Sequence, residues 1–341
     1  MTKKIAVLGT GANGSCAAAD LTRAGLDVTL IDQWPAHVEA MRRQGLRISM
    51  PEEELHVAVR AHHISDLASL GETYDVVFLV VKAYDTRWMC ELIKPYLKED
   101  GLLIGLQNAM TVDEIASVVG RKRTLGVVVE LSSEVFTPGV VQRNTPPKGT
   151  WFGVGSVYPE TKGRETEIAD LLRHVGKVSL SENVQSGKWM KLLINVMCLA
   201  PVAMTGQRVQ EAFRLPGMRE LAIKAGTEAL SVGQRMGYKT EPIIGLSANE
   251  MQDTNRLLEK LIDKITADVG PRSMDCCLQD HIKGRYTETD LINGLVVDES
   301  ERLGQSAPAN AAVVEITRRI TAGELKPDPT NLAQVRRELG L

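Results

Sequence analysis

A glycine-rich turn near the N-terminus has the residue types and spacing of a phosphate-binding loop. The segment GTGANG at 9–14 fits the pattern G-x-G-x-x-G and lies between a short apolar run and an Ala-rich one. In such a loop the first glycine permits a tight turn, the second lets a pyrophosphate approach, and the third lets the next helix pack closely. Free N–H groups at the start of that helix bind phosphate. We therefore expect a dinucleotide to contact Gly9, Gly11, Ala12, Asn13 and Gly14, the alternative being a plain glycine turn.

Asp32 ends the next apolar run, VTLID, where a ribose contact is expected about 20 residues past the fingerprint. A carboxylate there accepts hydrogen bonds from both ribose hydroxyls and repels a 2′-phosphate. The residues that follow, Gln33, Trp34 and Pro35, include no Arg or Lys to bind such a phosphate. The sequence thus predicts NAD as the cofactor rather than NADP. The alternative is that Asp32 only caps the next helix.

Two polar residues follow later apolar runs. Lys82 comes after VVFLVV, and Asn108 comes after LLIGLQ. Ligands of open parallel sheets bind at the carboxyl ends of the strands. We therefore expect Lys82 and Asn108 to line the same crevice as Gly9, although Lys82 also fits a solvated loop.

A lysine and an asparagine interrupt an otherwise apolar helical segment, KWMKLLINVMCLAPVAMTG at 188–206. Lys191 and Asn195 are spaced i, i+4 and so share a helix face. This suggests a ligand site within a buried helix. However, Lys188, Lys191 and Asn195 at i, i+3, i+7 also match the wet stripe of a surface helix, and the pattern alone leaves both open.

The surrounding elements divide the chain into two halves. In the first half, short apolar runs alternate with helical segments, which predicts a Rossmann-type doubly wound parallel α/β sheet. Expected strands are 4–8, 28–32, 76–81, 102–106 and 124–129, and expected helices are 13–24 and 36–44. After about residue 183 the periods are helical, at 187–204, 208–236, 248–268, 286–303 and 308–321, before a loosely docked tail helix. We predict a dinucleotide-binding domain at 1–182 and an all-helical C-terminal domain at 183–341.

Composition excludes several functional classes. The 341 residues carry a formal net charge of −3, which gives no basic field for nucleic acid or a membrane surface. No apolar run reaches the roughly 18 residues of a membrane span. The five cysteines form no C-x-x-C pair and the histidines no ligand spacing, so no metal site is expected. We expect a cytoplasmic protein that binds small molecules.

The chain resembles the ketopantoate reductase family along nearly its whole length. The matching motifs are the glycine loop at 9–14, VKAYDT at 81–86, LQNAM at 106–110, PGVV at 138–141, KWMKLLIN at 188–195, LQD at 278–280 and TETDLING at 287–294. This resemblance implies a Rossmann domain followed by a helical domain that binds substrate and can form a homodimer. It also implies reduction of a 2-oxo acid by a nicotinamide cofactor.

The resemblance also implies roles for individual residues. Lys191 matches the family's catalytic lysine, and Asn195 matches its first substrate-contacting asparagine. Glu288 matches an acidic residue near the cofactor ribose and the substrate, while Lys82 and Asn108 match residues of the cofactor crevice. Hydride addition to a ketone builds negative charge on its oxygen, which a lysine ammonium on the floor of an interdomain cleft stabilises and protonates. A carboxylate such as Glu288 would hold this lysine charged, and a capping box at Thr287–Asp290 would orient Glu288.

Three departures from the family pattern concern the substrate. Leu199 stands where a second asparagine is usual, and Cys276 where a serine is expected, with Ser273 three residues earlier. Ala109 replaces a glycine after Asn108. The lost amide and hydroxyl predict weaker selection of ketopantoate and a bulkier or more apolar oxo or hydroxy acid. Asp32 also departs from the family's more common NADPH preference, which favours an NAD-dependent dehydrogenase. Two alternatives stay open: a true 2-dehydropantoate 2-reductase of pantothenate biosynthesis, and a nucleotide-binding sensor without turnover.

Overall fold

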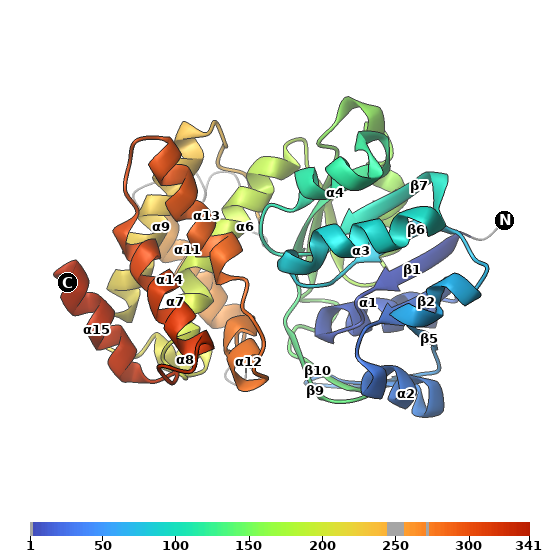
Figure 1. Ribbon diagram of the computed structural model, residues 1–341, viewed down its shortest axis with the longest axis horizontal. Helices are drawn as coiled ribbons and strands as arrows, with labels where there is room; N and C mark the ends of the chain where they lie inside the picture. The colour runs from blue at the N-terminus through green and yellow to red at the C-terminus, as the bar shows by residue number, and fades with distance from the viewer. Residues whose placement is uncertain (1–2, 244–255, 271–272) are drawn as a thin grey trace. The chain divides into compact units, whose positions relative to one another are not determined.

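The computed structural model describes residues 3–243, 256–270 and 273–341 (Figure 1). The chain separates into two compact units. The first unit comprises residues 1–107 and 111–185, and the second comprises residues 108–110 and 186–341. Part of one expected helix, residues 248–255, lies outside the described residues.

The first unit is built on an eight-stranded sheet with the strand order β12-β11-β8-β7-β6-β1-β2-β5. Within the described part of the chain every neighbouring pair is parallel except β8 and β11. The strands are β1 Lys4–Leu8, β2 Asp27–Asp32, β5 Arg60–His63, β6 Tyr74–Leu79, β7 Leu97–Gly105, β8 Thr124–Glu130, β11 Trp151–Gly155 and β12 Lys177–Leu180. The chain order reverses at β1, which lies between β2 and β6. The predicted Rossmann-type sheet is therefore confirmed, with its topological switch point at β1, the place where sheets of this kind bind ligands.

Helices cover both faces of this sheet (Figure 1). They are α1 Ala12–Arg23, α2 Pro35–Gln44, α3 Thr86–Ile93, α4 Val112–Val119 and α5 Glu165–Leu172. Ile5 and Val7 of β1 pack with α1, α2 and α5, whereas Ala6 and Leu8 pack with α3 and α4. Successive side chains of a strand point to opposite faces, so a strand covered on both sides must be apolar throughout. This is why the short apolar runs located the central strands.

A second, four-stranded sheet of order β4-β3-β10-β9 is absent from the elements predicted from sequence. Its strands are β3 Leu46–Ser49, β4 Glu54–Val57, β9 Ser133–Thr137 and β10 Val140–Arg143. The PGVV segment forms the turn from β9 into β10, and Gly139 there has φ +79°. Strands of four or five residues that alternate buried and exposed positions give only a weak hydrophobic signal.

Arg143, at the end of β10, forms a buried ion pair with α1. The guanidinium, 1% exposed, donates to Asp20 Oδ2 on α1 at 2.5 Å. It also donates to Thr150 Oγ1 and to the Val175 carbonyl, both at 2.9 Å. The small sheet thereby anchors the helix that begins at the glycine loop.

The second unit is helical in its described residues. Its helices are α6 Val184–Cys198, α7 Ala200–Ala203, α8 Val209–Ala212, α9 Met218–Arg235, α11 Leu257–Asp268, α12 Cys276–Ile282, α13 Thr289–Arg302, α14 Pro308–Thr321 and α15 Pro329–Leu339. The first two residues of α6 belong to the first unit. Two expected helices are each divided. The segment 187–204 breaks at Leu199 before Pro201, and 208–236 breaks at Pro216 and Gly217, where φ is +82°. Proline and a left-handed glycine explain both breaks.

Two glycines of α9 let α6 pack against it closely. A Cβ on Gly233 would lie 1.9 Å from Trp189 Nε1, and one on Gly226 would lie 2.6 Å from Met197 Sδ. Trp189 Nε1 also donates to the Ala229 carbonyl at 3.1 Å. These contacts fix the rotation of α6 about its axis and therefore the direction in which its polar residues point.

The tail helix α15 is docked more firmly than expected. Leu332 and Val335 are buried in the apolar core of the second unit. Asn331 Nδ2 donates to the carbonyls of Met204 and Lys326, at 2.9 and 2.8 Å. In residues 3–243, 256–270 and 273–341, no helix combines the length and apolar character needed to cross a bilayer.

Candidate functional site

The three glycines of the loop occupy three different steric environments. Gly9 has φ +90°, and a Cβ there would lie 2.5 Å from Val81 Cγ1. A Cβ on Gly14 would lie 2.0 Å from the Gly9 carbonyl oxygen, so α1 packs directly on the turn. A Cβ on Gly11 would meet nothing within 4 Å. The open space lies beside the glycine that a pyrophosphate must approach, and the loop therefore fits a dinucleotide.

The start of α1 is suited to an anion. The helix begins at Ala12 after Gly11, which has no side chain to cap it, and its first turn holds no acidic residue. The side chain of Asn13 is engaged elsewhere, because its Oδ1 accepts a 2.6 Å hydrogen bond from Ser133 Oγ. The N–H groups of the first turn can therefore bind phosphate oxygens, with the helix dipole contributing.

Asp32 is held in a fixed orientation at the end of β2. Its carboxylate, in a residue only 7% exposed, accepts from the Trp34 N–H at 2.8 Å and from Thr10 Oγ1 at 3.2 Å. Trp34, not Asp32, occupies the N-cap position of α2, and its side chain makes no capping hydrogen bond. A carboxylate oxygen can accept two hydrogen bonds, so each oxygen of Asp32 has capacity left for a ribose hydroxyl.

His37 of α2 is not among the residues predicted from sequence, yet it hydrogen-bonds to this loop. Its Nδ1 accepts from the Gly139 N–H at 2.9 Å, so the proton of the neutral ring lies on Nε2. Nε2 lies 2.9 Å from the Thr10 carbonyl and 3.2 Å from Ser15 Oγ. Burial lowers the pKa of His37, and the charge of Asp32 opposes this only in part. The neutral imidazole thus joins the glycine loop to the turn at Gly139.

Arg42, the first arginine after Asp32, is already bonded to other groups. Its guanidinium donates to Asp66 Oδ2 at 2.5 Å, Glu39 Oε1 at 2.9 Å and the Ala61 carbonyl at 2.9 Å. These bonds compete with any use of Arg42 as a ligand for a 2′-phosphate.

The segment that follows β6 lies against the glycine loop. Val81 contacts Gly9 closely, which brings half-buried Lys82 to the same edge of the sheet. Gln107 Nε2 donates to the Val81 carbonyl at 2.9 Å and to Thr86 Oγ1 at 3.0 Å. Gln107 therefore ties this segment to the end of β7.

Asn108 meets the asparagine predicted on α6. Asn195 Nδ2 donates to Asn108 Oδ1 at 3.1 Å, and residues 108–110 group with the second unit. Ala109 has φ +60°, a left-handed conformation that costs an L-residue about 1–2 kcal/mol. The glycine that Ala109 replaces would adopt this conformation without that cost, and the strained turn places Asn108 toward Asn195.

The polar residues of α6 do not form a solvent-exposed stripe. Asn195 is 3% exposed and Lys188 4%, while Lys191 is half-buried. The surface-helix alternative is therefore wrong. Burial lowers the pKa of Lys188 to about 8, and Glu288, itself 4% exposed, opposes this shift. The sequence pattern pairs Glu288 with Lys191 and places Lys188 only in a possible wet stripe.

The expected capping box before α13 is not formed. The helix begins at Thr289, and Asp290 Oδ1 accepts instead from Arg318 Nε of α14, at 2.9 Å. Thr287 Oγ1 lies 2.8 Å from Thr289 Oγ1. Arg318 competes for the carboxylate that a capping box would need, and nothing in the local sequence indicates this long-range partner.

Leu199 and Cys276 lie in one apolar cluster. They pack, together with Met274, against a buried group formed by Ala203, Cys277 and Leu278. The positions that carry an amide and a hydroxyl in the family pattern are thus joined here by apolar contacts. Ser273 is buried at 3% exposure.

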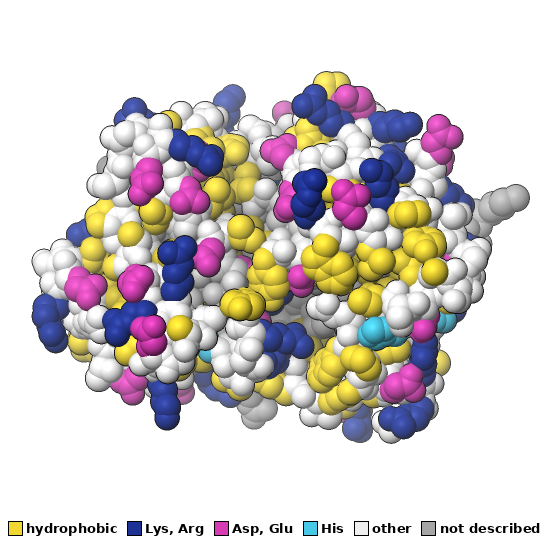
Figure 2. All heavy atoms as spheres, viewed as in Figure 1, with side chains coloured by type: hydrophobic (Ala, Val, Ile, Leu, Met, Phe, Trp, Pro, Cys, Tyr) yellow, Lys and Arg dark blue, Asp and Glu magenta, His cyan; other side chains and the backbone are white. Residues whose placement is uncertain are grey.

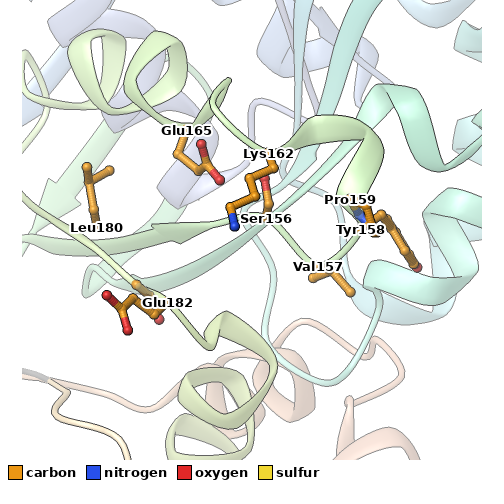
Figure 3. A pocket seen from close by; sticks show the side chains of 9 residues that line it. Ser156, Val157, Tyr158, Pro159, Lys162, Glu165, Leu180 and Glu182 are labelled. Atoms are coloured by element: carbon orange, nitrogen blue, oxygen red, sulfur yellow. The ribbon is translucent and has the colours of Figure 1, made fainter.

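A cavity of about 920 Å³ on the first unit contains none of the predicted site residues (Figure 3). It lies after the carboxyl ends of β11 and β12, and β11 runs antiparallel to β8. The cavity and Gly9 therefore lie at opposite ends of the strands of this sheet. Figure 3 shows Ser156, Lys162 and Glu165 gathered on one side of it.

Charges of both signs are interspersed on the visible face of the molecule (Figure 2). Across the described residues, no three His, Cys, Asp or Glu side chains are grouped to hold a metal ion.

Comparison with known proteins gives matches over both units. The family model described as "Ketopantoate reductase PanE/ApbA" matches residues 5–156, and the model of its C-terminal domain matches residues 183–321. The 2-dehydropantoate 2-reductase of Archaeoglobus fulgidus is 26% identical over 323 residues, which are 94% of this chain and 99% of that protein.

Two solved structures share the fold over nearly the full length. A PanE/ApbA family ketopantoate reductase from Ralstonia eutropha JMP134 is 26% identical, with a TM-score of 0.79 over 94% of this chain and 99% of that one. A D-mandelate dehydrogenase solved with NADH and anilino(oxo)acetate has a TM-score of 0.81 at 20% identity, covering 94% and 98%. At that identity the likeness to the second structure concerns the fold alone.

Proposed function

The chain belongs to the ketopantoate reductase family of oxidoreductases, and we propose that it interconverts a small 2-oxo acid and its 2-hydroxy acid with NAD(H). The observation that carries this proposal is the set of polar residues around α6. Lys191 and Asn195 share one face of a helix in an apolar core, and Asn195 bonds to Asn108. Such a cluster suits a small polar ligand, because an ammonium and an amide on one helix face can bind the same carbonyl or carboxylate group.

In the proposed reaction Lys191 is the general acid and base. When bound, the nicotinamide cofactor supplies or accepts the hydride at the carbonyl carbon. The Lys191 ammonium stabilises the negative charge that develops on the carbonyl oxygen and then gives it a proton from Nζ. Asn195, which is held by Asn108, orients the substrate. Glu288 accepts hydrogen bonds from the substrate. In the oxidative direction neutral Lys191 takes the hydroxyl proton.

The preference for NAD rests on Asp32 and Arg42. Asp32→Ala is expected to weaken NADH binding by roughly 10- to 100-fold, because hydrogen bonds to a charged acceptor contribute about 1.5–3 kcal/mol. NADPH binding should weaken less or improve, since the variant loses a repulsive charge. Fluorescence titration of the protein with NADH and with NADPH measures the dissociation constant of each cofactor. Asp100→Ala, which removes an exposed carboxylate from the same unit, is the matched control. Wild-type protein that binds NADPH as tightly as NADH would contradict the role given to Asp32.

The apolar cluster at Leu199 and Cys276 supports a substrate more apolar than ketopantoate. We expect faster loss of NADH absorbance with 2-oxo acids that carry branched aliphatic or aryl groups than with ketopantoate. The reverse reaction is followed with NAD and the matching hydroxy acids. Fast turnover of ketopantoate would favour the alternative of a true 2-dehydropantoate 2-reductase. Cofactor binding without turnover of any 2-oxo or 2-hydroxy acid would favour a sensor.

A further inference from the structure

His37 contacts both residues that donate hydrogen bonds to the Asp32 carboxylate. One donor is the Trp34 N–H, which bonds to Oδ1, and the other is Thr10 Oγ1, which bonds to Oδ2. The rings of Trp34 and His37 are stacked, with their centroids 5.3 Å apart and an interplanar angle of 19°. Nε2 of His37 lies 2.9 Å from the Thr10 carbonyl oxygen. One side chain of α2 therefore touches both groups that orient the carboxylate.

The imidazole of His37 is itself held in place by the turn between β9 and β10. Its Nδ1 accepts from the Gly139 N–H at 2.9 Å, and the residue is 0% exposed. A Cβ on Gly139 would lie 3.0 Å from Ala40 Cβ, so this turn packs directly on α2. An acceptor at Nδ1 and a donor at Nε2 occur together only in the neutral ring. Burial lowers the pKa of His37, which favours that form at neutral pH, and the charge of Asp32 only partly opposes this.

We propose that His37 is a positioning residue that determines cofactor preference, because it holds the Asp32 carboxylate in the orientation that binds the ribose of NAD. It acts through Thr10 and Trp34 and does not itself contact the cofactor. This inference rests on the proposed function, which assigns the ribose contact to Asp32. A carboxylate that is fixed before binding loses little conformational freedom when NAD binds, and it stays directed at the place where a 2′-phosphate would lie.

The ratio of the dissociation constants for NADPH and NADH tests this role, because general damage to the glycine loop would weaken both cofactors alike. His37→Leu keeps much of the volume of the ring but removes its hydrogen bonds and its stacking. It is expected to lower the ratio by about five- to tenfold, mainly through weaker binding of NADH. In the Asp32→Ala background the same substitution should change the ratio less than about twofold. His174→Leu, at an exposed position of the same unit, is the matched control and should leave the ratio unchanged.

Two amide variants separate the contacts of the ring. The amide of Gln reaches the position of Nε2 and can donate to the Thr10 carbonyl, whereas the shorter Asn reaches only the position of Nδ1 and can accept from Gly139. His37→Gln should therefore recover most of the preference for NADH, and His37→Asn should not. Fluorescence titration gives the dissociation constants, and circular dichroism shows that each variant is folded. If His37→Leu does not fold, His37→Asn tests the same expectation.

The possible failures are distinguishable. A preference for NADH that survives both His37→Leu and His37→Asn would overturn this inference alone. Equal weakening of NADH and NADPH in these variants would also overturn it, because His37 would then only support the loop. Wild-type protein without a preference for NADH would instead overturn the role of Asp32 in the proposed function, and this inference with it.

Discussion

Lys191→Met is expected to lower kcat by about 100- to 10,000-fold, the range in which positioned general acids contribute. Methionine has nearly the length of lysine and fills the space of its apolar stem, but it offers no charge to the developing oxyanion and no proton. The contacts that the proposed reaction assigns to Asn195 and Glu288 stay in place. KM should therefore change less than kcat. Steady-state kinetics with the preferred 2-oxo acid measure both constants.

NADH affinity is the control for this variant. The glycine loop and Asp32 belong to the first unit, so the dissociation constant for NADH should be within about twofold of wild type. Lys326→Met, which removes an exposed lysine from the second unit, should leave kcat unchanged. A Lys191→Met protein that retains near-normal kcat would show that another group transfers the proton.

Much of the first unit could be predicted because its strands are buried on both faces. Continuous apolar runs such as 76–81 are unambiguous in a parallel sheet, and each predicted central strand overlaps an observed one. The four-stranded sheet was missed because its strands are short and alternate in burial. The helix breaks at Leu199 and Gly217 depend on a proline and a left-handed glycine. The spacing of apolar residues, from which the helices were predicted, does not reveal such breaks.

The glycine loop was predictable from sequence because its conformation depends on local backbone geometry. Gly9 and Gly14 are each required by a close contact, with Val81 just after the neighbouring strand and with the Gly9 carbonyl, and Gly11 leaves open space beside the turn. The polar residues of the second unit depend on long-range partners instead. The electrostatic interaction of Glu288 with Lys188 and the hydrogen bond of Asp290 with Arg318 join segments far apart in the chain. The sequence pattern indicated that Glu288 and Asp290 are important, but only the structure identified their partners.

Arg143→Met is expected to destabilise the first unit by about 3–5 kcal/mol, the cost of leaving one charge of a buried pair alone. The guanidinium satisfies Asp20 and also the Thr150 hydroxyl and the Val175 carbonyl. Its loss leaves all three acceptors without this donor inside the core. The midpoint of urea unfolding, followed by circular dichroism, measures the change. Arg173→Met is the matched control, because Arg173 pairs with Asp170 at the surface and should contribute at most about 1 kcal/mol.

The effect of Arg143→Met should also depend on pH. Burial raises the pKa of Asp20 above its usual value, and Arg143 is the strongest opposing influence. Without Arg143 the folded-state pKa rises further, so the native state binds a proton that the unfolded chain releases above about pH 4. Stability then falls as pH rises from about 4 through the folded-state pKa. The destabilisation should therefore be smaller at pH 5 than at pH 8, whereas a loss due only to the missing apolar packing of the arginine stem would be the same at both.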